Sequence, residues 1–157
     1  MTTREFERLT IKYTDCIYRI AIHACRTRED AEDLTQEAFL KLWRSRHVFE
    51  TDEDAKRWLI RVTVNAGKNL LRHLSGIKMV PLEELFQEPQ WEHSEFSWLY
   101  QSIGRLPLKY RQVLYLYYFE GYQVREIAAI LHRTETAVQT QLLRARQKLK
   151  KELGDQS

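Results

Sequence analysis

The chain has 157 residues, of which 43% are hydrophobic and 30% are charged, and its formal net charge is +3. This length and apolar content allow one domain or two small ones with a buried core, and they exclude a chain that is disordered throughout. No run of about 18 apolar residues is available to span a membrane, and the first residues lack the apolar stretch of a secretory signal. We therefore expect a cytoplasmic protein that does not insert into membranes.

Basic and acidic side chains are unevenly distributed along the chain. The net charge is +2 over residues 1–72, −4 over residues 73–96 and +5 over residues 97–157. The basic C-terminal part suits a polyanionic partner such as nucleic acid, although an ordinary solvated surface can have the same composition. The two cysteines and five histidines lack the spacing of metal or redox sites. We expect no metal, no cofactor and no catalytic residue, and hence a protein that is not an enzyme.

Strand signals are weak along the whole chain, since alternating apolar runs are few and Gly and Pro number only 5 and 3. We therefore predict an all-α protein. The first part is expected to hold three helices that form one small domain over residues 1–72. The second and third of these begin with a Thr-x-x-Asp capping pattern, at Thr27 and at Thr51. The predicted helices span residues 4–24, 28–44 and 52–72.

The second predicted helix has an apolar inner side and a polar outer side. Acidic residues near a helix start partly serve the helix dipole, but here they also offer a carboxylate and amide surface to a basic partner helix. The outer residues in question are Asp33, Gln36 and Glu37. The residues at core spacing are Ala31, Leu34, Ala38, Phe39, Leu42 and Trp43.

The third predicted helix carries a row of cations interrupted by one amide. Arg and Lys side chains hold phosphates, and Asn65 supplies both a donor and an acceptor for a base. The row therefore suits nucleic acid, with a solvated polar face as the alternative interpretation. The outward row consists of Arg57, Arg61, Asn65, Lys68 and Arg72. The inner stripe opposite it consists of Leu59, Val62, Ala66 and Leu70.

Residues 73–96 lose the helical period, contain Gly76, Pro81 and Pro89, and are acidic. This stretch is longer than most connections inside a compact domain, so we predict a flexible linker. A second small helical domain is expected over residues 97–157. Its predicted helices span residues 95–104, 107–119, 123–131 and 135–151.

The last two predicted helices form a helix-turn-helix, because only three residues, His132 to Thr134, separate them. Val138, Leu142, Ala145 and Leu149 give the last helix one core stripe. Its opposite face is expected to enter the major groove, and Arg146 and Lys148 to attract the DNA backbone. The predicted DNA-facing residues are Thr136, Gln139, Thr140, Leu143 and Arg144. An amphipathic helix with a basic, solvated side is the alternative.

Three segments of the chain also carry a family resemblance. They are residues 30–43 (DAEDLTQEAFLKLW), residues 58–69 (WLIRVTVNAGKN), and the pair LPLKYRQVL and EIAAIL that begins at residues 106 and 126. In order and separation they resemble regions 2.1–2.2, 2.3–2.4 and 4 of the extracytoplasmic-function (group IV) sigma factors of the sigma-70 family.

The resemblance implies a subunit that binds core RNA polymerase and directs promoter-specific initiation. Asp33, Gln36 and Glu37 would then meet the clamp helices of the polymerase β′ subunit. The loop over residues 47–55 and the row around Asn65 would melt and read the −10 element, with Asn65 near the loop where a flipped base is held. The last helix would read the −35 element while its domain touches the β flap. An anti-sigma factor is a common partner in the family, and we expect one here.

The chain departs from the family pattern in the helix-turn-helix. Gln139 and Gln141 replace residues that are commonly basic, and His132 stands in the turn where the family often has Gly. These changes predict an altered −35 sequence, since Gln favours adenine. Two further functions fit parts of the pattern. A stand-alone helix-turn-helix regulator would bind DNA as a dimer without polymerase, and a sigma-like decoy would bind an anti-sigma factor and start no transcription.

Overall fold

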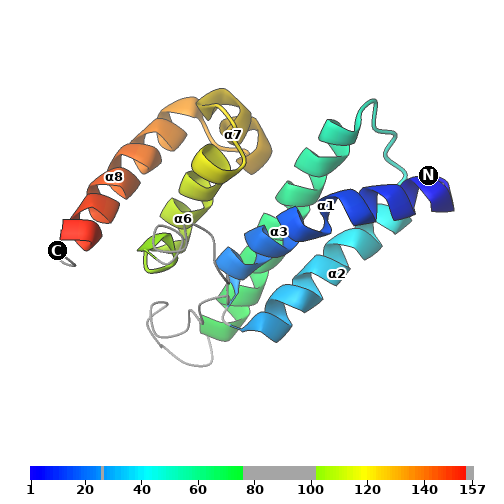
Figure 1. Cartoon of the computed structure of the whole chain (residues 1–157), viewed down its shortest axis with the longest axis horizontal. Helices are drawn as coiled ribbons and strands as arrows, with labels where there is room; N and C mark the ends of the chain where they lie inside the picture. The colour runs from blue at the N-terminus through cyan, green and yellow to red at the C-terminus, as the bar shows by residue number, and fades with distance from the viewer. Residues whose placement is uncertain (26, 76–101, 155–157) are drawn as a thin grey trace. The chain divides into compact units, whose positions relative to one another are not determined.

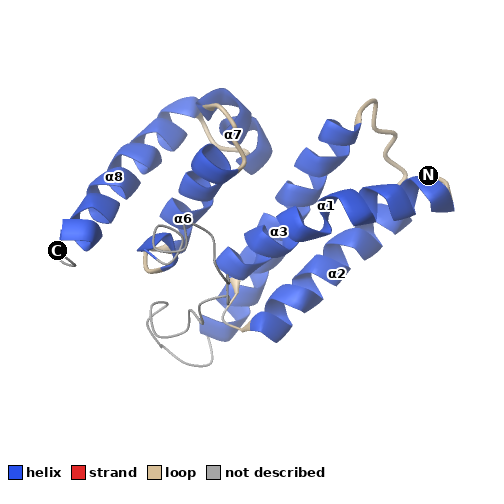
Figure 2. Cartoon of the chain, in the orientation of Figure 1, coloured by secondary structure: helices blue, strands red, loops and turns tan. Residues whose placement is uncertain are grey.

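The computed structural model describes residues 1–25, 27–75 and 102–154, with the side chains of residues 24 and 71–75 excepted. Its regular elements are all helices (Figure 2), so the all-α prediction is confirmed. The chain divides into two compact units, Met1–Met79 and Val80–Ser157. None of the described helices is long and apolar enough to cross a membrane.

Unit 1 consists of three helices, α1 (Thr3–Ala24), α2 (Arg28–Arg44) and α3 (Asp52–Ser75), and each packs against the other two (Figure 1). Threonine caps begin α2 and α3, as the Thr-x-x-Asp pattern predicts. The Thr27 hydroxyl accepts a hydrogen bond from the Asp30 N–H at 3.1 Å, and the Thr51 hydroxyl accepts one from the Asp54 N–H at 3.1 Å. These caps fix where each helix leaves its loop.

The core of unit 1 corrects two of the predictions for side-chain placement. On α3, Ile60, Thr63 and Val64 are fully buried beside Leu59, whereas the predicted stripe residues Val62, Ala66 and Leu70 are only half-buried. The reason is that α3 has neighbours on two sides, α1 and α2, so its buried face lies off the expected stripe. Trp43, predicted in the core, is 45% exposed and contacts the Phe6 ring edge-on with 5.0 Å between ring centroids.

Unit 2 contains a helix that changes its winding. Helix α6 (Leu108–Leu114) continues without a break into the π-helical turn η1 (Tyr115–Phe119). Within η1 the rings of Tyr115 and Phe119 stack at 5.4 Å, and the Tyr115 hydroxyl donates to Glu120 at 3.0 Å. The chain then turns at Gly121, whose φ of +74° is the left-handed conformation that glycine adopts at no steric cost. The wider winding was not expected from the single helix predicted over residues 107–119.

The helix-turn-helix consists of α7 (Val124–Leu131) and α8 (Glu135–Gly154), joined by three residues as predicted. His132 ends α7 in the left-handed conformation, with φ 52° and ψ 49°. The Thr134 hydroxyl then accepts a hydrogen bond from the Ala137 N–H at 3.0 Å and caps α8. The two helices pack against each other, and their buried residues are Ile127, Ala128, Ile130, Leu131, Val138, Leu142 and Ala145.

Candidate nucleic-acid interfaces

The predicted row on α3 lies on the outer side of unit 1. Arg61 and Asn65 are exposed, while Arg57 and Lys68 are partly covered. Arg57 pairs with Glu53 one turn earlier, with 3.4 Å from its Nε to a carboxylate oxygen. An exposed pair of this kind contributes little stability and is easily exchanged for a phosphate. Arg72 belongs to the last turns of α3, but its side chain lies outside the described residues.

The loop between α2 and α3 forms a pocket of about 250 Å³ against the start of α1. Its lining includes His47, Val48 and Phe49 of the loop and Arg8 of α1. The rings of His47 and Phe49 each lie 5.8 Å from the ring of Trp58. Asn65 does not line this pocket, because ten residues of α-helix after Ala55 span about 15 Å. The loop pocket and the Asn65 surface are therefore separate.

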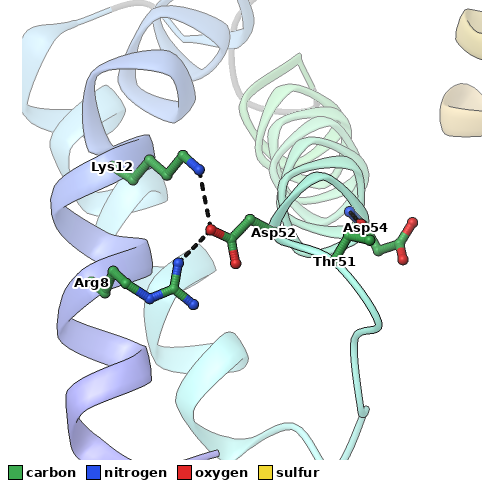
Figure 3. A network of polar contacts seen from close by, with 5 residues as sticks. All are labelled: Arg8, Lys12, Thr51, Asp52 and Asp54. Carbon is green, nitrogen blue, oxygen red and sulfur yellow. Dashed lines mark hydrogen bonds and ion pairs between the residues drawn. The ribbon is translucent and has the colours of Figure 1, made fainter.

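An ion triad holds the start of α3, directly after this loop, to α1 (Figure 3). One carboxylate oxygen of Asp52, the first residue of α3, accepts from Arg8 and also from Lys12, the latter at 3.1 Å. These two hydrogen bonds lower the pKa of Asp52 from its ordinary 3.8 to about 2, and they raise the pKa values of Arg8 and Lys12. The triad positions the pocket wall, and it is absent from the predictions because its members lie 40 and 44 residues apart.

Helix α2 presents the predicted surface residues Asp33, Gln36 and Glu37, and all three are exposed. Glu37 pairs with Lys41 at 3.1 Å, and Asp33 and Glu37 line a shallow groove of about 310 Å³ against α3. Two apolar side chains that sequence reasoning missed extend the same outer side. Leu40 is 50% exposed and Trp43 is 45% exposed, one and two turns beyond Gln36. Only their exposure in the folded chain indicates that they belong to this surface, since the pattern of apolar residues alone placed Trp43 in the core.

Helix α8 exposes the predicted reading face. Gln139 and Arg144 are exposed, and Leu143 is 56% exposed despite its apolar side chain. Thr136 is exposed and Thr140 is half-buried. An exposed leucine beside polar residues suits contact with a thymine methyl group in the major groove. The structure therefore brings all five predicted residues to the side of α8 away from its core stripe.

Two cations of unit 2 do not extend freely into solvent. The Nε–H of Arg146 donates to the Tyr118 hydroxyl at 2.9 Å, and its guanidinium lies 5.2 Å from the centre of the Tyr117 ring. Arg133, in the turn, donates to Gln141 at 2.9 Å and to Gln112 at 3.0 Å, and burial lowers its pKa. An arginine remains charged even so. Arg146 is thus preoriented by tyrosines, and Arg133 is part of the packing between α6 and α8.

A three-helix unit with an exposed cation and amide row, together with a second unit that presents a helix-turn-helix, defines a two-part helical DNA-binding protein. Models of known families cover both units. The sigma-70 region 2 model matches residues 11–76, and the sigma-70 region 4 model matches residues 96–149.

Relatives and solved structures agree with this match. The RNA polymerase sigma factor NccH of Alcaligenes xylosoxydans xylosoxydans is 31% identical over 132 residues, which are 76% of this chain and 71% of NccH. The ECF RNA polymerase sigma factor SigM of Mycobacterium tuberculosis (strain ATCC 25618 / H37Rv) is 28% identical over 151 residues, 95% of this chain and 77% of SigM.

The fold is shared with the sigma factor RpoE in its complex with the anti-sigma factor NepR from Bartonella quintana. That structure has a TM-score of 0.78 and 19% identity, and the match covers 97% of this chain and 98% of the other. The chain therefore belongs to the extracytoplasmic-function sigma factors of the sigma-70 family, the RNA polymerase subunits that act in promoter-specific transcription.

Proposed function

We propose that α2 carries the surface that binds core RNA polymerase. Asp33, Gln36 and Glu37 supply acceptors for basic groups on the β′ clamp helices, and the exposed side chains of Leu40 and Trp43 supply apolar contact beside them. This combination supports the proposal because partly exposed aromatic and apolar anchors beside polar groups are the usual makeup of an interface centre. The polymerase then performs the chemistry, and the sigma subunit contributes binding and positioning alone.

Helix α3 and the preceding loop are proposed to melt and read the −10 element. Arg57, Arg61, Lys68 and Arg72 hold backbone phosphates, and Asn65 contacts a base. Unpairing a base costs a few kcal/mol, and a pocket that captures the displaced base offsets this cost. The loop pocket supports such a role because its lining includes the rings of His47 and Phe49, which both contact Trp58, and single-stranded bases stack on aromatic side chains.

Unit 2 is proposed to bind the −35 element through the face formed by Thr136, Gln139, Thr140, Leu143 and Arg144, and to touch the β flap. In this division residues 1–72 act on polymerase and the −10 element, residues 97–157 act on the −35 element, and residues 73–96 link them. The action takes place in the cytoplasm, where polymerase and promoters lie.

An anti-sigma factor is the proposed regulator. Two proteins with this fold have been solved with a protein partner, RpoE with the anti-sigma factor NepR and CnrH with the cytosolic domain of CnrY. The apolar side chains Leu40 and Trp43 offer a surface for which a regulator and core polymerase would compete. A pull-down with the partner and an excess of core polymerase tests that competition.

The observation that carries the proposal is the separation of two exposed surfaces of opposite chemistry, on α2 and on α3, within one small unit. We expect Asp33→Ala to weaken binding to core polymerase about tenfold and to leave DNA melting by the assembled holoenzyme unchanged. We expect Asn65→Ala to lower open-complex formation about tenfold and to leave core binding unchanged. Equal loss of both activities in either variant would contradict the assignment.

A further inference from the structure

Arg133 occupies an unusual place for a cation. It stands in the three-residue turn of the helix-turn-helix, and its guanidinium lies between α6 and α8. Its Nη1 donates to Gln141 Oε1 at 2.9 Å, and its Nη2 donates to Gln112 Oε1 at 3.0 Å. Within the described part of the chain, both of its hydrogen-bond partners are neutral amides. One guanidinium thus connects the turn to a helix on either side.

The hydrogen bond from Arg133 determines which atoms of the Gln141 amide can contact DNA. A guanidinium has donors and no acceptor, so the amide groups of Gln112 and Gln141 must turn their oxygens toward it. Gln141 is half-buried beside the core residue Leu142, and its oxygen points to Arg133. A glutamine reads adenine through its oxygen and its NH₂ group together. With its oxygen turned toward Arg133, Gln141 does not present its oxygen and its NH₂ group together to one adenine.

Gln139, two residues earlier, is in the opposite situation. It is exposed, and no residue in the described ranges hydrogen-bonds its side chain. Both ends of its amide are available to a base edge. The two glutamines that replace basic residues in this helix are consequently not equivalent, because one faces the groove and the other faces Arg133.

We propose that Arg133 is a positioning residue for promoter recognition: it holds α8 on α6 through the two amides and removes Gln141 from base reading, which leaves Gln139 as the amide that reads the −35 element. The proposal rests on the proposed binding of the −35 element by α8. Arg133 in the turn thus acts by holding two helices together, whereas a basic residue on the exposed face of α8 would contact DNA directly.

The same substitution at the two glutamines separates these roles. We expect Gln141→Glu to keep −35-dependent transcription within about twofold of the wild type, since Arg133 binds the new carboxylate. We expect Gln139→Glu to lower it about tenfold or more, because an exposed carboxylate then faces the DNA. Transcription is measured with reconstituted holoenzyme on a promoter with a matched −35 element and on the same promoter with that element scrambled.

Thermal unfolding supplies a second measurement that needs no DNA. Gln141→Glu is expected to raise the unfolding midpoint of the full chain and Gln139→Glu to leave it unchanged, since only position 141 gains a charge-assisted hydrogen bond. In an Arg133→Met background, the gain from Gln141→Glu should vanish.

Equal loss of −35 dependence in the two Glu variants would overturn the proposal, as would a lower unfolding midpoint for Gln141→Glu. A wild-type protein that ignores the −35 element would instead refute the proposed function of α8. The unfolding measurements would still show whether Arg133 binds position 141, so the two failures are distinguishable.

Discussion

His132 closes α7 in a backbone conformation that favours glycine. Its φ of 52° and ψ of 49° lie in the left-handed region, where a Cβ atom costs about 1 kcal/mol. Histidine enters this region more readily than most residues, and its side chain here is exposed. The turn therefore forms without Gly, at some cost to stability.

We expect His132→Gly to raise the free energy of unfolding of unit 2 by roughly 0.5–1 kcal/mol, because the strain at positive φ is relieved and the exposed His132 side chain contributes little packing. Thermal unfolding followed by circular dichroism measures the change. His132→Val is the matched control, and it should destabilise the unit because a β-branched side chain is disfavoured at positive φ. A lower stability for His132→Gly would contradict this account of the turn.

Local side-chain contacts could be predicted from the sequence, but contacts between residues far apart in the chain could not. The caps at Thr27 and Thr51 were predictable because donor and acceptor lie three residues apart. Arg133 binds partners 8 and 21 residues away, and no local pattern indicates which of two neighbouring glutamines it contacts. Such pairs depend on how the helices pack, so only the folded chain identifies them.

At the scale of elements, the triad of Asp52 with Arg8 and Lys12 joins α3 to α1. The pKa of Asp52 in the folded chain is about 2, below the ordinary 3.8, so Asp52 binds a proton more readily in the unfolded chain than in the folded one. The stabilisation is therefore complete above about pH 4 and is lost as the pH falls toward 2.

We expect the unfolding midpoint of unit 1 to fall more steeply between pH 4 and about pH 2 in the wild type than in Asp52→Asn. The triad is exposed to solvent, so added salt should reduce the difference. Thermal unfolding at several pH values and two salt concentrations measures it. Parallel pH profiles of the two proteins would mean that the triad does not stabilise the fold.

The apolar end of the α2 surface provides another prediction at this scale. Leu40→Lys is expected to lower affinity for core polymerase about tenfold, because it removes an apolar contact from the proposed interface. Folding should change by less than about 0.5 kcal/mol, since Leu40 is half exposed and Lys is a good helix former. Ile11→Lys, at an 84% exposed position of α1, is the control. Equal affinities of both variants for core would refute the contact.

The faces of the elements were less predictable than the elements themselves. Helical periodicity and caps placed α1, α2, α3, α7 and α8, but periodicity could not choose between two apolar stripes on α3. Ile60 and Val64 are as apolar as Val62, and the buried Thr63 is polar, with its hydroxyl bonded to the Leu59 carbonyl at 2.7 Å. The choice depends on the neighbours, α1 and α2, which the periodicity of one helix does not specify.

For the whole molecule, we propose that recognition of polymerase and promoter is divided between the two units. The net charge of residues 97–157 is +5, whereas that of residues 1–72 is +2 despite the cationic row on α3. Carboxylates of α2 and of the first turn of α3 offset that row, as expected for a unit that we propose to bind protein on α2 and DNA on α3. On this proposal we expect a promoter to need both elements together, because each small unit would contribute only part of the binding free energy.

The most direct test is transcription by core bacterial polymerase with this protein on a pool of promoters randomised at both the −10 and −35 positions, with start sites read by sequencing. We predict that start sites are enriched behind a paired motif at fixed spacing. Asn65→Ala should relax selection at the −10 positions, and Gln139→Ala should relax it at the −35 positions. The account is contradicted if the protein binds core polymerase and no paired motif is selected.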